Sequence, residues 1–192
     1  MPTLQPQSET EAERPEKKHR FSEASKEKID PEIWRQVEAA FNEGFGLYIF
    51  GNVGTGKTFL CHAIKKENRD CKLINTLELL AKIKATFRNE SAGVTESESE
   101  IIDEFSGESR WVSHPDGLLI LDDIGVEKPS EWAQQTLFLI IDRRYQQLRK
   151  TVFTSNLSLD ELSERLGDRI TSRIADMCKV IEIKGKDRRV NK

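Results

Sequence analysis

This sequence of 192 residues has few cysteines, a small net charge and no long apolar run. No apolar stretch approaches the about 18 residues that a membrane-spanning helix needs, and the first residues are polar and charged. We therefore expect neither a transmembrane span nor a secretory signal peptide, and no membrane partner. The 30 basic and 33 acidic side chains nearly cancel, leaving a net charge of −3. This balance argues against a wholly basic nucleic-acid binder, although a local basic patch stays open.

The three cysteines, Cys61, Cys71 and Cys178, are odd in number and widely spaced, and they form no C-x-x-C pair. Such spacing argues against a disulfide framework and against a structural zinc site. We expect reduced and mostly buried thiols in a cytoplasmic protein.

Composition divides the chain into a tail and one domain. Residues 1–29 mix Pro, Ser, Glu, Lys and Arg with almost no apolar side chains, so burial cannot offset their ordering entropy. We predict that they form a disordered charged tail. Asp30 followed by Pro31 is a helix-start signal, and residues 30–192 are enough for a single α/β domain with a substantial core.

Residues 51–58 match the phosphate-binding pattern G-x-x-x-x-G-K-[ST] without a mismatch. A short apolar run precedes them, typical of a buried parallel strand, and a helix-compatible segment follows. The glycines let backbone N–H groups surround an anion, Lys57 is expected to reach the β- and γ-phosphates, and the Thr58 hydroxyl to ligate Mg²⁺. The alternative is an ordinary glycine-rich turn. The predicted nucleotide-binding residues are Gly51, Asn52, Val53, Gly54, Thr55, Gly56, Lys57, Thr58 and Phe59.

A second informative stretch, residues 118–123, consists of four apolar residues and then two carboxylates. This is the Walker B arrangement, a buried strand that ends at the sheet edge where ligands of open α/β sheets collect. We expect Asp122 to hold Mg²⁺ through water, and Asp123 to orient or deprotonate the attacking water. A strand that ends in a polar turn is the simpler alternative.

A further β-branched stretch, residues 151–156, ends in small polar residues. If this strand inserts between the strands that carry Lys57 and Asp122, Asn156 would lie beside the phosphate loop. It would then bond the attacking water or the γ-phosphate. Taken alone, Ser-Asn after a strand is only a turn signal.

Several cations lie on predicted helices. In the helix capped by Asn75 we expect one face to be buried, namely Leu77, Leu80, Ile83 and Phe87. The opposite face carries Lys82, Lys84 and Arg88, which fits either a solvated face or a strip that follows a phosphate backbone. On the helix that starts at Ser130 and runs to about Arg149, we expect Arg143, Arg144 and Arg149 to face solvent. Arg169 and Arg173 are four residues apart, so both can emerge from one helical face.

Taken together, these segments resemble the AAA+ ATPases of the DnaC/IstB-like group, which includes bacterial replicative helicase loaders and transposon ATPase helpers. The resemblance covers about residues 45–190. It is carried by GNVGTGKT, KATFRN, LLILDDIG, IDRR, TSN and LGDRITSRI. Because the chain ends soon after its last predicted strand, we expect any C-terminal lid to be minimal. The resemblance implies an AAA+ P-loop fold of three layers with a central five-stranded parallel sheet. In that sheet the Asn156 strand lies between the P-loop strand and the Asp122 strand.

The resemblance also implies roles for individual residues. Asn156 would be the sensor-1 residue, Arg173 the arginine finger donated to a neighbouring subunit, and Arg169 an interface arginine. Arg189 would act as sensor 2. Lys82, Lys84 and Arg88 would belong to the DNA-contacting region, with Phe87 packed inward.

The function implied by the family is ATP hydrolysis by a homo-oligomer that forms with ATP on single-stranded DNA and acts on a replicative DNA helicase. Three alternatives stay open: a transposition helper like IstB, a small P-loop metabolite kinase, and a nucleotide-gated binding module with negligible hydrolysis.

Overall fold

The computed structural model describes residues 20–87, 96–108, 117–126, 130–185 and 187. Its core is one five-stranded sheet in the order β2-β3-β4-β1-β5, and every neighbouring pair is parallel. The strands are β1 (Gly46–Phe50), β2 (Cys71–Asn75), β3 (Leu118–Asp122), β4 (Thr151–Ser155) and β5 (Cys178–Glu182). Because β4 pairs with both β1 and β3, the predicted insertion of the Asn156 strand is confirmed.

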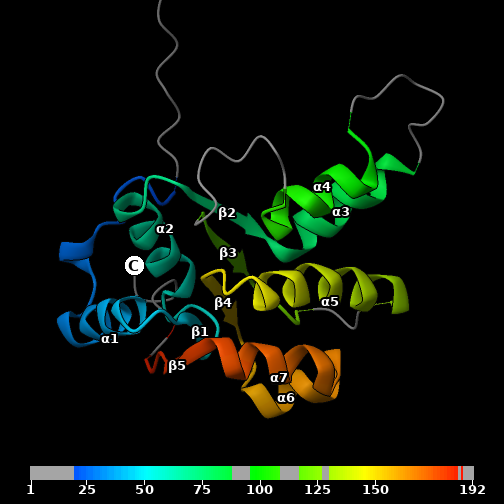
Figure 1. The fold of residues 1–192 in the computed structure, drawn as a ribbon. Helices are drawn as coiled ribbons and strands as arrows, with labels where there is room; N and C mark the ends of the chain where they lie inside the picture. Colours follow the sequence, from blue (N-terminus) through cyan, green and yellow to red (C-terminus); the bar gives the residue numbers. More distant parts are fainter. Residues whose placement is uncertain (1–19, 88–95, 109–116, 127–129, 186, 188–192) are drawn as a thin grey trace, which may run out of the picture.

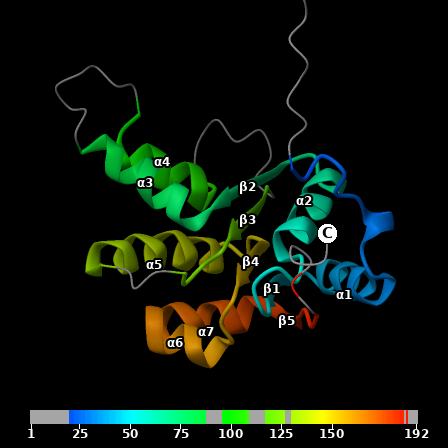
Figure 2. The ribbon, with the colours of Figure 1, turned by 180° about the vertical axis from the view of Figure 1, so that it is seen from behind.

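Helices cover both faces of this sheet (Figure 1). They are α1 (Pro31–Asn42), α2 (Lys57–Glu67), α3 (Thr76–Thr86), α4 (Glu98–Ser106), α5 (Glu131–Gln146), α6 (Leu159–Leu166) and α7 (Asp168–Met177). In the opposite view α1 and α2 again lie on one face, and the other five helices lie on the second face (Figure 2). The result is the predicted three-layer AAA+ fold. No helix in the described ranges is long and apolar enough to span a membrane.

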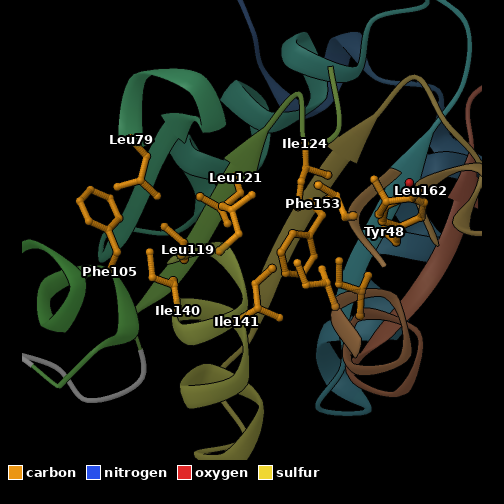
Figure 3. Packing of buried hydrophobic residues seen from close by; sticks show 14 of the residues in the cluster. Tyr48, Leu79, Phe105, Leu119, Leu121, Ile124, Ile140, Ile141, Phe153 and Leu162 are labelled. Carbon is orange, nitrogen blue, oxygen red and sulfur yellow. The ribbon is translucent and has the colours of Figure 1, made fainter. Parts of the chain in front are cut away.

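Two apolar cores follow from the alternation of side chains along the strands. Leu47 and Ile49 of β1 face α1 and α2, while Tyr48 between them faces the other layer. On that second face, Leu119 and Phe153 pack close to Ile140 and Ile141 of α5 (Figure 3). Because helices cover both faces of the sheet, successive side chains of a central strand are all buried. This explains the continuous apolar runs in the sequence of these strands.

Local capping chemistry sets the helix starts. The Asp30 carboxylate accepts a hydrogen bond from the Glu32 N–H at 2.8 Å, and Pro31 occupies the first helical position, as predicted. Ser158 and Glu161 form a capping box that starts α6. These caps satisfy N–H groups that have no partner within the helix.

The predicted boundary between the tail and the domain, at residue 30, is wrong, because residues 20–29 already pack against the domain. The Phe21 ring stacks on His62 of α2 with centroids 4.6 Å apart, and Lys66 Nζ donates to the Ser22 carbonyl at 2.6 Å. Ala24 is fully buried, so this segment has a small apolar anchor that composition alone conceals. Residues 1–19 of the predicted tail lie outside the described residues.

Arg144 was expected to face solvent, but it is buried, with only 3% of its surface exposed. Its guanidinium donates to Thr151 Oγ1 and to the carbonyls of Phe105, Gly117 and Lys150 at 2.8–3.2 Å. Burial lowers the pKa of this guanidinium to about 9, which leaves it charged at neutral pH. Arg144 therefore joins the starts of β3 and β4 to the end of α4.

The predicted buried stripe of α3 is wrong at its ends. Leu79 is fully buried, whereas Leu77 and Phe87 are 38% and 49% exposed. Phe87 does not pack inward, and its ring meets the edge of Trp132 on α5 at 5.7 Å. The α5 helix ends at Gln146 rather than near Arg149.

Candidate nucleotide-binding site

The phosphate loop connects β1 to α2 at the carboxyl edge of the sheet. Gly54 and Gly56 have positive φ angles of 78° and 108°, which residues with a Cβ rarely adopt. The α2 helix starts directly after them, at Lys57. The N–H groups of its first turn and the positive end of its dipole are therefore available to an anion.

Lys57 lies at the centre of this site and is only 5% exposed. Its ammonium donates to the carbonyls of Gly51 and Asn52 at 2.7 and 2.9 Å, and to Asn156 Oδ1 at 2.7 Å. Because Asn156 directly follows β4, the last of these bonds brings the end of β4 to the phosphate loop. The structure thus brings together two residues that the sequence predicted to act at one site.

Thr58 and Asp122 form the candidate magnesium site. The Thr58 hydroxyl donates to Asp122 Oδ2 at 3.0 Å, so the first turn of α2 meets the end of β3. A hydroxyl and a single carboxylate suit Mg²⁺, which keeps several waters and takes its other ligands from phosphates. The residues present therefore fit this ion.

Asp122 is held in place by its neighbours. Thr154 Oγ1 donates to Asp122 Oδ1 at 2.6 Å, and Thr76 Oγ1 donates to the Asp122 carbonyl at 3.0 Å. Cys61 of α2 also lies under this carboxylate, with its Sγ 4.0 Å from Oδ1. Complete burial, and secondarily the charge of Asp122, raise the pKa of the Cys61 thiol well above its ordinary value.

Asp123 follows at the edge of the sheet with a φ of 58°, a left-handed conformation that aspartate tolerates better than most residues. Its N–H donates to Thr154 Oγ1 at 2.9 Å, and the Ile124 N–H donates to the Thr154 carbonyl at 2.8 Å. The chain therefore turns sharply after Asp122, and the Asp123 side chain is half-buried at the site.

One side chain near the C-terminus also reaches the phosphate loop. The Asp187 carboxylate lies directly against Gly54, where an added Cβ would collide with it. The site therefore has a negative group beside the loop that is predicted to receive phosphates. Arg189, the predicted sensor-2 residue, lies outside the described residues.

Arg169 and Arg173 lie on α7, in the layer opposite α2 (Figure 1). Arg173 is partly exposed and ion-paired with Asp142 of α5, while Arg169 is exposed. They do not join Lys57 and Asp122 within one copy of the chain.

The predicted DNA-contacting cations differ in their surroundings. Lys82 forms ion pairs with Glu96 and Glu104 at 3.2 and 3.6 Å. Lys84 is exposed, and within the described ranges it has no ion pair. Arg88 lies outside the described residues.

The model of the IstB-like ATP-binding proteins matches residues 41–192. The chain belongs to this family. The match includes all five strands and every residue of the site described above.

Individual relatives of this IstB-like protein are replication proteins. It is 29% identical over 145 residues to the replicative helicase loader DnaC of Escherichia coli (strain K12), covering 73% of this chain and 54% of that one. It is 26% identical over 166 residues to the replicative helicase loader DnaI of Bacillus subtilis (strain 168), with coverages of 78% and 50%. The chain thus spans about half the length of the curated relatives it matches.

Solved structures agree with the fold. A crystal structure of the DnaC helicase loader superposes with a TM-score of 0.68 at 26% identity, covering 86% of this chain and 99% of that one. The replication initiator DnaA bound to AMPPCP and single-stranded DNA also superposes with a TM-score of 0.68. Its 20% identity, with coverages of 85% and 50%, shows the AAA+ fold alone.

The sequence did not predict the contacts of three residues: Thr154 and Asp187 at the phosphate site, and Asp142 beside Arg173. Thr154 and Asp142 stand inside the TSN and IDRR segments, so their motif positions were a usable signal. Nothing local distinguishes Asp187 from a solvated charge in a basic stretch.

Proposed function

We propose that this chain is an ATPase of DNA replication that loads or remodels a replicative helicase. The observation that carries the proposal is the convergence of three strand ends on one site. Lys57 meets Asn156 at 2.7 Å, and Thr58 meets Asp122 at 3.0 Å. Membership of the IstB-like ATP-binding family supports the nucleotide, and the DnaC and DnaI relatives support the process.

Each residue of the site has a defined part in this proposal. Lys57 exchanges the carbonyls of Gly51 and Asn52 for β- and γ-phosphate oxygens, and Thr58 and Asp122 hold Mg²⁺. The ion, when bound, neutralises charge on the phosphates. Asp123 orients the attacking water and takes its proton, while Asn156 bonds that water or the γ-phosphate.

The proposed site is completed by a second copy of the chain. Arg173 is ion-paired with Asp142 near the C-terminal end of α5, which leads to the start of β4, whereas Lys57 meets Asn156 beyond the end of that strand. Arg173 is therefore held away from the phosphate loop of its own chain. A guanidinium donated in trans is worth about 10³–10⁵ in rate, or about 4–7 kcal/mol of barrier. Arg169 would help to fix the subunit contact. A monomer would then bind ATP but hydrolyse it slowly, so assembly acts as the switch.

Single-stranded DNA is the proposed ligand of the α3 surface. Lys84 is exposed and suited to contact phosphates directly, whereas Lys82 has to leave Glu96 and Glu104 first. Arg88 follows Lys84 by four positions in the sequence and would add a third cation to this proposed contact. With these proposed partners, the activity would take place in the cytoplasm.

A transposition helper is the second candidate, because the matching family model is that of IstB-like proteins. Its ATP chemistry would be identical. A helicase pull-down, compared with the same experiment on a transposase, separates the two partners.

Mixing two inactive variants tests the shared site. Arg173→Ala keeps its phosphate loop but donates no finger, and Lys57→Ala donates a finger but binds no triphosphate. Neither variant alone should hydrolyse ATP at the wild-type rate, and their mixture should recover part of it. A mixture that stays inactive would exclude a site shared between subunits.

The proposed binding of single-stranded DNA is tested by a separate measurement. Single-stranded DNA should stimulate hydrolysis, and raising the salt concentration should weaken this effect. Lys84→Ala should reduce the stimulation, whereas Lys65→Ala, which removes an exposed lysine from α2, should not. Equal stimulation of both variants would remove the α3 surface from the proposal.

A further inference from the structure

The arginine proposed as the finger is held by several contacts within its own chain. Arg173 Nε donates to Asp142 Oδ1, and Arg173 Nη1 donates to the Arg169 carbonyl at 3.3 Å. The guanidinium carbon lies 5.0 Å from the ring centre of Phe138 and 5.7 Å from that of Tyr145. These contacts leave the side chain 31% exposed.

Asp142 is itself fixed. Its side chain is only 17% exposed, and its second oxygen, Oδ2, accepts a hydrogen bond from Gln146 Nε2 at 2.6 Å. Both carboxylate oxygens are therefore occupied, one by Arg173 and one by the next turn of α5. A carboxylate restrained in this way determines the orientation of the guanidinium that it binds.

Asp142 binds only one edge of the Arg173 guanidinium, the one that carries Nε. A guanidinium presents its five N–H donors in a flat fork, and two of its edges can each bind a carboxylate or phosphate. Asp142 takes Nε, and among the described residues nothing accepts a hydrogen bond from Nη2. The Nη2 group and the second Nη1 proton are therefore available to a phosphate while Asp142 stays bound.

We propose that Asp142 is the positioning residue of the Arg173 finger, an inference that rests on the proposed function. Asp142 holds Nε in the free subunit, so that the outer edge of the fork is oriented before a neighbouring subunit's γ-phosphate arrives. Ordering the side chain in advance reduces the entropy cost of subunit assembly. In this role Asp142 contacts neither the phosphates nor the attacking water.

In a mixed assembly one subunit donates Arg173 and its neighbour accepts it at an ATP site. If Asp142 positions Arg173, its loss should impair the donor and leave the acceptor unaffected, whereas a merely structural role would impair both. The donor in the test is Lys57→Ala, and the acceptor is Arg173→Ala. Adding Asp142→Ala to the donor should reduce the recovered ATP hydrolysis by about 10- to 100-fold, because misplacement of a reacting group by about 1 Å has effects of this size. Asp142→Asn, which keeps one acceptor oxygen, should give an intermediate loss.

Asp103 provides the matched control. It pairs with Arg143, the residue next to Asp142, through a 2.7 Å bond between α4 and α5. A Lys57→Ala, Asp103→Asn donor should therefore restore ATP hydrolysis by the Arg173→Ala acceptor to the same level as the Lys57→Ala donor. A single Asp142→Ala protein should melt within a few degrees of wild type and bind ATP normally. It should also hydrolyse ATP when mixed with the Lys57→Ala donor.

Two results would overturn the inference while the proposed function stands. One is full recovery with the Lys57→Ala, Asp142→Ala donor. The other is recovery above the level of the parent donor, because Asp142 would then compete with the phosphate for Arg173. If the Lys57→Ala donor itself restores no ATP hydrolysis to the Arg173→Ala acceptor, the shared site is excluded. The proposed role of Asp142 is then excluded as well.

Discussion

The Thr154 hydroxyl donates a 2.6 Å hydrogen bond to Asp122 Oδ1 and accepts one from the Asp123 N–H at 2.9 Å. A single buried hydroxyl thus ties the end of β4 to Asp122, the last residue of β3, and to Asp123 directly after it. Oδ2 of Asp122 is left to face Thr58. The orientation of the candidate magnesium ligand therefore depends on a residue from the neighbouring strand.

Thr154→Val should weaken Mg²⁺-dependent nucleotide binding, because it removes both hydrogen bonds with little change in shape. A buried hydrogen bond to a charged group is worth about 1.5–3 kcal/mol, so we expect the Mg²⁺ midpoint to rise by about tenfold or more. Titration of Mg²⁺ against a fluorescent ATP analogue measures this. Thr154→Ser keeps the hydroxyl and should stay close to wild type, and equal behaviour of the two variants would contradict the assignment.

Lys57→Ala should abolish ATP binding or turnover, because it removes the only ammonium among the described residues that bonds the phosphate loop. Isothermal titration with ATP and a phosphate-release assay report the two effects. Lys65→Ala on the same helix is the control for a general loss of positive charge. Unchanged turnover in Lys57→Ala would remove the assigned phosphate site.

Asp123→Asn should spare ATP binding and lower hydrolysis by about 10²–10⁴-fold, the usual contribution of a general base. Asparagine is the suitable substitution because it also tolerates the φ of 58° found here, so the turn after β3 is kept. Binding and single-turnover rates are measured on the same preparation. Turnover at the wild-type rate would mean that another group activates the water.

Arg144→Met should destabilise the fold by about 3 kcal/mol or more, because it leaves several buried carbonyl and hydroxyl groups without their donor. Arg143→Met removes the neighbouring arginine, whose ion pairs with Asp103 and Glu108 are partly exposed. This control should cost less than about 1 kcal/mol. Urea unfolding of both variants decides the matter, and similar losses would contradict the structural role of Arg144.

Asp187→Asn should tighten nucleotide binding by about three- to tenfold, because it removes a negative charge that lies beside the loop proposed to receive the triphosphate. Screening predicts that this gain shrinks as the salt concentration rises. Weaker binding in the variant would instead indicate that the carboxylate supports the shape of the loop.

The sequence alone determined the elements whose signals are local. The Gly51–Thr58 pattern, the two carboxylates after an apolar run and the caps at Asp30 and Ser158 each depend on a few adjacent residues. Backbone conformation at such positions is dictated by glycine, proline and short polar side chains, so both the motif and its place at a strand end could be predicted.

Tertiary structure decided which distant groups meet. Lys57 and Asn156 are 99 residues apart in the chain, and Arg173 meets Asp142 across two helices. Periodicity shows which face of a helix is apolar, but not what covers a cation on its border. Arg144 and Arg143 are adjacent and chemically identical, yet only the first is buried, where it donates to the Gly117 and Lys150 carbonyls at the strand starts. Those carbonyls belong to other segments, and only the folded chain brings them there.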